Sequence, residues 1–205
     1  MIRQLDHVIY VVLDLAAASD EWRKRGFTVT PGGEHAGGLT HNALIGLEDG
    51  SYVELIAFHD VAAAKGKHGW QPVAERGGGW ADFALLSNDL LKDAHGLGEL
   101  LLRPPEDGGR TRPDGLAIAW RSARLRSPLP FLIEDLTARE LRVPHGEAAK
   151  HANGTRGIAS VDLGARDTGA TAEGYARLRA LGAPGIGIEP AAHDRLLNVT
   201  FSPRT

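Results

Sequence analysis

The sequence predicts an α+β protein built from repeated β-α-β-β-β modules. An apolar, strand-like run followed by an aspartate and a helix-like segment occurs three times along the chain. The first occurrence continues into further strand-like runs joined by turn residues, which completes one module. Because the repeat is too long for a solenoid, we expect the modules to pair so that their sheets pack or join around a shared concavity.

The first module is expected over residues 1–58. Its first strand is the run LDHVIYVV, which Asp14 follows, and the segment LAAASDEWRKRGF then has helical spacing. The later strands are expected in FTVT, THNALIGL and YVELIAF. Asp49 and Gly50, between the last two runs, are a strong two-residue hairpin signal.

The rest of the chain repeats this order with changes. Residues 59–79 are expected to form a helical linker that ends in three glycines. A second, degenerate module is expected over 80–143, with Asp89 in the place of Asp14 and later strands in GLAIAWRSARL and FLIEDL. Residues 144–205 are expected to form a partial third repeat that completes the same domain.

The composition limits the partners and the chemistry. The 205 residues carry a formal net charge of -3, so we expect no general attraction to nucleic acid or to an anionic membrane. The chain has no cysteine, so any metal would be held by imidazole and oxygen ligands. The sequence has no signal-peptide pattern and no apolar run near the ~20 residues of a membrane helix. A cytoplasmic protein with a small-molecule substrate or ligand is expected.

Several runs carry a resemblance to a known superfamily. The segments LDHVIYVVLDL, RKRGFTV, THNALIGLEDGSYVELIAF, GGRTRPDG, LPFLIED and HANGTRG resemble the glyoxalase-like branch of the vicinal oxygen chelate superfamily. The resemblance implies a half-open barrel of paired modules, with a divalent metal inside it in the enzymatic members. Those members include isomerases, epimerases and extradiol dioxygenases, whereas others bind drugs without catalysis. Modules can pair within one chain or in a homodimer, and the sequence leaves this open.

The resemblance points first to His7 and Glu54 as metal ligands. In the metal-using members one ligand is a histidine on the first strand of a module, and another is a glutamate on its last strand. A carboxylate between Val53 and Leu55 in so apolar a strand is costly to bury unless it is paired, protonated or bound to a cation. We therefore expect His7 and Glu54 to face one cavity. The alternatives are a buried, hydrogen-bonded His-Glu pair or a glutamate that faces the sheet edge.

Three further histidines are weighed as candidate site residues. His41, at the start of the third strand, is a candidate metal ligand or general base, or else a strand-end residue that bonds nearby backbone. His151 is a candidate metal ligand that would restore an imidazole missing from the second module, or else part of a polar connector. His35 lies in a glycine-rich stretch and is expected to be an exposed loop residue.

The second module departs from the superfamily pattern. Aligning Asp89 with Asp14 places Asp82 opposite His7, where a second histidine is usual. Glu134 lies near the place of Glu54, out of step by a residue or two, and is a candidate catalytic carboxylate. Either the second module supplies oxygen ligands to a hard ion, or its share of the metal site has been lost.

These residues predict a metal-dependent lyase or isomerase for a small, oxygen-rich substrate. A divalent ion, with Mg, Mn, Zn, Ni and Fe all open, would act as a Lewis acid. Glu54, His41 or Glu134 would move the proton, and the substrate-binding candidates are Arg121, Tyr52 and Trp120. The alternative is a non-catalytic small-molecule binding or drug-sequestering protein, so that enzymatic activity stays undecided. An extradiol-type dioxygenase ranks lower for want of a clear second strand histidine.

Overall fold

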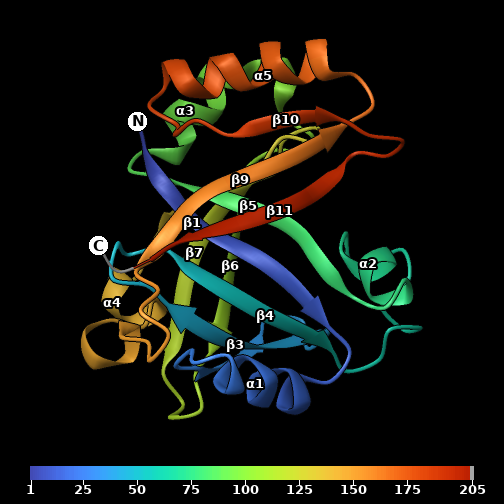
Figure 1. Cartoon of the computed structure of the whole chain (residues 1–205). Coiled ribbons are helices and arrows are strands. Elements are labelled where there is room, and N and C mark those ends of the chain that lie inside the picture. Colours follow the sequence, from blue (N-terminus) through green and yellow to red (C-terminus); the bar gives the residue numbers. More distant parts are fainter. Residues whose placement is uncertain (204–205) are drawn as a thin grey trace.

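Residues 1–203 are described by a computed structural model (Figure 1). Within these residues, eight strands close into a barrel and three more form a separate sheet, with helices packed outside. The predicted α+β fold of repeated modules is confirmed. No helix among the described residues is long and apolar enough to cross a membrane.

The first half of the barrel comes from the N-terminal part of the chain. Its elements are β1 (Ile2–Val12), α1 (Leu15–Lys24), β2 (Thr30–His35), β3 (Thr40–Gly46) and β4 (Tyr52–Phe58). Asp14 caps α1, because its side chain accepts the backbone N–H of Ala17 at 2.9 Å. Gly50 has a φ of 82°, which suits the turn between β3 and β4. Hydrogen bonds join these strands in the order β1-β4-β3-β2.

The second half repeats this arrangement. Its elements are β5 (Gly79–Ser87), α3 (Leu90–Leu97), the short turn η1 (Gly98–Leu100), β6 (Glu106–Thr111), β7 (Ala117–Ala123) and β8 (Phe131–Asp135). Asp89 caps α3 through the backbone N–H of Lys92. The barrel closes where β1 pairs with β5 and β2 pairs with β6, both antiparallel. In the segment between the two halves, the helix α2 covers only Gln71–Glu75.

The C-terminal segment forms the separate sheet. After α4 (Arg139–Arg142) and η2 (Gly146–Ala149) come β9 (Gly157–Ala165), α5 (Thr168–Ala180), β10 (Gly187–Pro190) and β11 (Arg195–Ser202). Asp167 caps α5 as the other two aspartates cap their helices. Figure 1 shows α5 beside α3, and Arg177 of α5 donates to the carbonyls of Gly96 and Leu97 at the end of α3. The third repeat thus packs outside the barrel.

Alternating strand residues divide the apolar side chains between two clusters. Val8, Leu85 and Leu132 belong to the larger cluster, which also holds Trp22 of α1 and Tyr175 of α5. Their strand neighbours belong to a second cluster inside the barrel. That inner cluster consists of Ile9, Val11, Ile56, Phe58, Ala64, Ala74, Ala84, Leu86, Phe131 and Ile133. The polar side chains that share this inner face form the site described next.

Candidate functional site

A cavity of about 280 Å³ lies in the barrel interior. Side chains from both halves line it, which matches the usual concave site for a small ligand. The polar and charged lining residues are His7, His35, Thr40, Asn42, Glu54, His68, Asp107, Arg110, Ser122, Arg124 and Arg142. The aromatic lining residues are Tyr52, Trp70, Trp120 and Phe131.

His7 is held by the carboxylate of the preceding residue. Its Nδ1 lies 2.6 Å from Oδ2 of Asp6, and a carboxylate only accepts hydrogen bonds, so Nδ1 donates. In the neutral ring this leaves Nε2 without a proton, and Nε2 lies 3.5 Å from Oε2 of Glu54. The ring of Tyr52 stacks on His7 at 4.5 Å. The imidazole is therefore fixed in one orientation with its free nitrogen toward Glu54.

Glu54 lies at the centre of a group of polar contacts. Its Oε1 accepts from Nδ2 of Asn42 at 2.7 Å and lies 3.2 Å from Nε2 of His35. Burial would raise the pKa of Glu54. The hydrogen bond and charge of His35, the charge of His7 and the hydrogen bond of Asn42 outweigh burial and lower that pKa to about 2. The bond to Glu54 also orients the Asn42 amide. Its Oδ1 is the one buried side-chain nitrogen or oxygen atom of residues 1–203 that has no hydrogen-bond partner.

Two arginines from the segment after β8 support Asp6. Arg142 donates to both Asp6 oxygens, at 2.9 and 3.0 Å, and Arg139 donates to Oδ1 at 2.5 Å. Burial alone would raise the pKa of Asp6, but Arg142 and His7 hold it well below its usual range. Arg142 also donates to the hydroxyl of Tyr52 at 2.8 Å. The carboxylate behind His7 thus stays ionised.

The second half contributes a cation and aromatic rings to the cavity. Arg124 pairs with Asp82 at 2.5 Å, and Asp82 also accepts from the Trp70 indole at 3.1 Å. The Arg124 guanidinium lies 4.7 Å from the ring centroid of Trp70 and 4.4 Å from that of Phe131. Burial and the charge of Arg124 lower the pKa of His68 to about 4. His68 is therefore neutral at pH 7.

Strand register shows why this half lacks a carboxylate where Glu54 stands in the first. Glu54 pairs with Ile9, and Phe131 pairs with Ala84, the residue that matches Ile9 when Asp14 and Asp89 are aligned. Phe131 thus occupies the place of Glu54. Glu134 lies three residues further along β8, opposite Arg121 in the pairing with β7.

Some of the predicted site residues line the cavity, and others lie outside it. His7, Glu54, Tyr52 and Trp120 all line it. Arg121 lies on the other face of β7, because its neighbours Trp120 and Ser122 face inward, and it pairs with Asp107 at 2.6 Å. Glu134 faces outward for the same reason, since its neighbour Ile133 lines the cavity.

His151 and His41 also lie away from the cavity. Nδ1 of His151 accepts the backbone N–H of Thr28 at 2.9 Å, so Nε2 carries the proton that it donates to the Gly46 carbonyl at 2.8 Å. Neither nitrogen is left for a metal in this arrangement. His41 lies on the outer face of β3, because Asn42 beside it faces inward.

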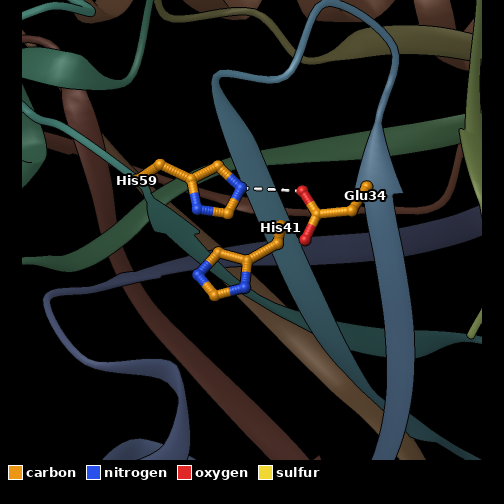
Figure 2. Close-up of side chains that lie close together, drawn as sticks. All are labelled: Glu34, His41 and His59. Carbon is orange, nitrogen blue, oxygen red and sulfur yellow. Dashed lines mark hydrogen bonds and ion pairs between the residues drawn. The ribbon is translucent and has the colours of Figure 1, made fainter.

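Outside the barrel, His41 joins Glu34 and His59 in a second polar group (Figure 2). Nε2 of His59 lies 2.7 Å from Oε2 of Glu34, and the rings of His41 and His59 stack at 4.4 Å. Partial burial and the neighbouring His59 lower the pKa of His41. Each residue offers one ligand atom within 4.8 Å of the others, so the group could hold a metal ion.

The exposed loop predicted for His35 is wrong. β2 continues through Gly32 and Gly33 with a register shift and ends at His35. The His35 side chain is 17% exposed and contacts Glu54. The two glycines keep the sequence from predicting this strand, because glycine is rare inside strands. A usable signal is the short AGGL turn, which lets TPGGEH pair with THNALIG as a hairpin.

Comparison with known proteins identifies the family. The sequence profile of the family described as a glyoxalase-like domain matches residues 5–179. A search of curated proteins found no match. A solved structure of a hypothetical protein from Staphylococcus aureus is 16% identical with a TM-score of 0.77, and the match covers 96% of this chain and 89% of that one.

Structures of methylmalonyl-CoA epimerase variants from Streptomyces coelicolor, in complex with 2-nitronate-propionyl-CoA, are also similar. They are 22% identical with a TM-score of 0.51, and the match covers 67% of this chain and 100% of theirs. At such identities the solved structures show a shared fold, whereas the family profile spans most of the chain. The chain belongs to the family described as a glyoxalase-like domain.

Proposed function

We propose that the protein is a divalent-metal-dependent lyase or isomerase for a small, anionic, oxygen-rich substrate bound in the barrel. The observation that carries the proposal is the group formed by His7, His35 and Glu54. Both imidazoles direct Nε2 at the same buried carboxylate, one at each oxygen. Two nitrogens and a carboxylate facing one another in a cavity form a donor set for a divalent transition metal.

The surroundings of these donors fit a metal ion. Asp6 behind His7 gives the carboxylate–histidine arrangement that supports metal-bound imidazoles. In the same way, Asn42 bonds and orients the Glu54 carboxylate, and the Thr40 hydroxyl bonds Nδ1 of His35 and orients that ring. His7, His35 and Glu54 would hold the ion. When bound, it would supply Lewis-acid chemistry toward two adjacent substrate oxygens.

The charge on the cavity wall favours an anionic substrate. Arg110 is buried, and its guanidinium donates to the backbone carbonyls of Gly32 and Arg142 rather than to a carboxylate. Arg124 brings a second guanidinium, which shares its charge with Asp82. A substrate carboxylate could bind either group through paired hydrogen bonds. Trp120 and Trp70 would cover the apolar part of the same molecule.

His68 has the properties of a hydrogen-bond donor to substrate oxygen. Its Nδ1 accepts the backbone N–H of Trp70 at 3.3 Å, so in the neutral ring Nε2 carries the proton. The lowered pKa keeps that ring neutral at pH 7. A neutral imidazole of this kind can polarise a carbonyl or stabilise a developing oxyanion without first losing a proton.

Metal analysis of protein purified without an affinity tag tests the proposal. We expect a divalent ion at the cavity donors, and we expect His7→Ala, His35→Ala and Glu54→Gln each to lose it. His151→Ala is the matched control, because that imidazole is partly buried but bonds only the backbone. Cavity metal unchanged in all three variants would overturn the donor assignment. Protein that binds no metal in the cavity and is equally stable with chelator would overturn the metal-dependent function and favour the alternative, a non-catalytic binding protein.

The donor set itself supports a second candidate, an Fe(II)-dependent oxygenase. Two histidines and one carboxylate with open positions are the ligand pattern of non-haem Fe(II) oxygenases. The sequence ranked this class lower for want of a second histidine, and His35 supplies one beside Glu54. Loading with Fe(II), Mn(II), Ni(II) or Zn(II) separates the candidates. Turnover that consumes O₂ only with Fe(II) supports the oxygenase, and anaerobic turnover with exchange of solvent deuterium into substrate supports the lyase or isomerase.

A further inference from the structure

Two imidazoles and a carboxylate meet on the outside of the barrel, where the cavity donors do not reach. Figure 2 shows Glu34 from β2, His41 from β3 and His59 just after β4, with their polar ends together. Glu34 and His59 have side chains that are 57% and 45% exposed, so an ion from solvent could reach them. None of the three lines the interior cavity.

The sheet fixes the spacing of these three residues. Glu34 and His41 are direct partners in the β2–β3 pairing, and His41 pairs with Ala57 in the β3–β4 pairing. The backbone N–H of His59 donates to the Leu39 carbonyl at 3.1 Å, which holds His59 against the end of β3. Donors on paired strands need little reorganisation to bind an ion, unlike donors on free loops.

We infer that Glu34, His41 and His59 form a second metal site, which binds a divalent transition-metal ion on the outer surface of the barrel. The chemistry of the donors selects the ion: two imidazole nitrogens and one carboxylate oxygen suit Zn²⁺, Co²⁺, Ni²⁺ or Cu²⁺ better than Mg²⁺ or Ca²⁺. Three protein ligands leave open positions toward solvent.

The outer site and the cavity lie on opposite faces of the same strands, β2 and β3. Glu34 precedes His35, and His41 precedes Asn42, so alternation along β2 and β3 sends one residue of each pair outward and the other inward to Glu54. Thr40, next to His41, bonds Nδ1 of His35 at 2.9 Å. An ion outside would therefore tie together the strand ends that position His35 at the cavity. Its role is that of a structural clamp.

Titration of the metal-free chain with Co²⁺ tests the site, because Co²⁺ reports its ligands by visible absorption. We expect Glu34→Gln, His41→Ala and His59→Ala each to remove one bound ion per chain or to weaken its affinity at least about tenfold. Tenfold is the lower end of the loss in metal affinity when even a hydrogen-bond partner of a ligand is removed. His95→Ala, an exposed histidine of α3, is the matched control. Because Glu34 and His59 are largely exposed, their variants should keep the unfolding midpoint of the metal-free protein.

The experiment separates the outer site from the proposed function. Glu54→Gln should lose the cavity ion and keep the outer one, whereas His59→Ala should do the reverse. Wild-type Co²⁺ stoichiometry and affinity in all three outer variants would overturn the outer site, whatever the cavity binds. The clamp is checked by hydrogen exchange of residues 34–41, where Zn²⁺ should slow exchange in Glu54→Gln. Exchange that Zn²⁺ leaves unchanged in that variant would overturn the clamp.

Discussion

Replacing Asp6 by asparagine tests the buried charge network behind His7. Asp6 is fully buried and accepts from Arg142, Arg139 and His7. Asparagine keeps the shape but removes the charge, which leaves Arg142 with Asp135 as its remaining carboxylate partner. Removing one partner of a buried ion pair costs about 3–5 kcal/mol. Because the amide oxygen can still accept, we expect a loss of about 3 kcal/mol, at the lower end.

That loss is large beside the total stability of about 5–15 kcal/mol for a typical domain. For a chain of this length it corresponds to a fall in Tm of about 6–12 °C. Urea denaturation followed by tryptophan fluorescence measures it directly. Asp107→Asn is the matched control, because Asp107 pairs with Arg121 at the surface and its loss should barely move the midpoint. A loss below about 1 kcal/mol for Asp6→Asn would refute the reasoning.

The same variant should show a defined pH dependence. The folded-state pKa of Asp6 lies well below its value in the unfolded chain, so its stabilisation is complete above that unfolded value of about 4. The stabilisation is lost as pH falls through the folded-state pKa. The stability difference between wild type and Asp6→Asn should therefore be largest near neutral pH and shrink toward pH ~2. A constant difference would mean that the carboxylate charge is not its source.

Three further outcomes are expected. Glu54→Gln should flatten the acid side of the urea-midpoint profile, because the pKa of Glu54 is lowered to about 2 and its stabilisation is lost as pH falls below about 4.5; a profile parallel to wild type would contradict this. His151→Ala should cost about 1–3 kcal/mol by calorimetry, because it leaves the Thr28 N–H and Gly46 carbonyl without partners, and should leave bound metal unchanged. Gly108→Ala should shift tryptophan fluorescence, since a Cβ there would lie 2.7 Å from the Trp120 indole nitrogen; an unchanged spectrum would show that the ring does not rest on β6.

Features that depend on local sequence could be predicted well. The three aspartates that follow strands cap the next helices, because an N-cap needs only a side chain and a backbone N–H three residues on. His7 and Glu54 line one cavity because strand alternation fixes which face each side chain takes.

Features that depend on long-range register could not be read from the sequence. Arg142 reaches Asp6 from 136 residues away, and no local pattern marks it as a partner. The offset between Phe131 and Glu134 follows from the pairing of β5 with β8, which residue spacing alone does not give. The cavity position of His35 could not be predicted for a related reason, since its strand is recognisable only once β2 is paired with β3.

The unequal halves of the barrel have a consequence for how this chain can change. Under the proposed function, the donors His7, His35 and Glu54 all come from the first copy, whereas Arg124 and Phe131 come from the second. Substitutions at position 124 can therefore alter what the cavity accepts while the donors are kept, whereas the Phe131 ring lies edge-on to His7 at 5.4 Å. Under this proposal the first copy carries the metal donors and the second copy sets which ligands fit, so the second copy is the place to redesign ligand preference.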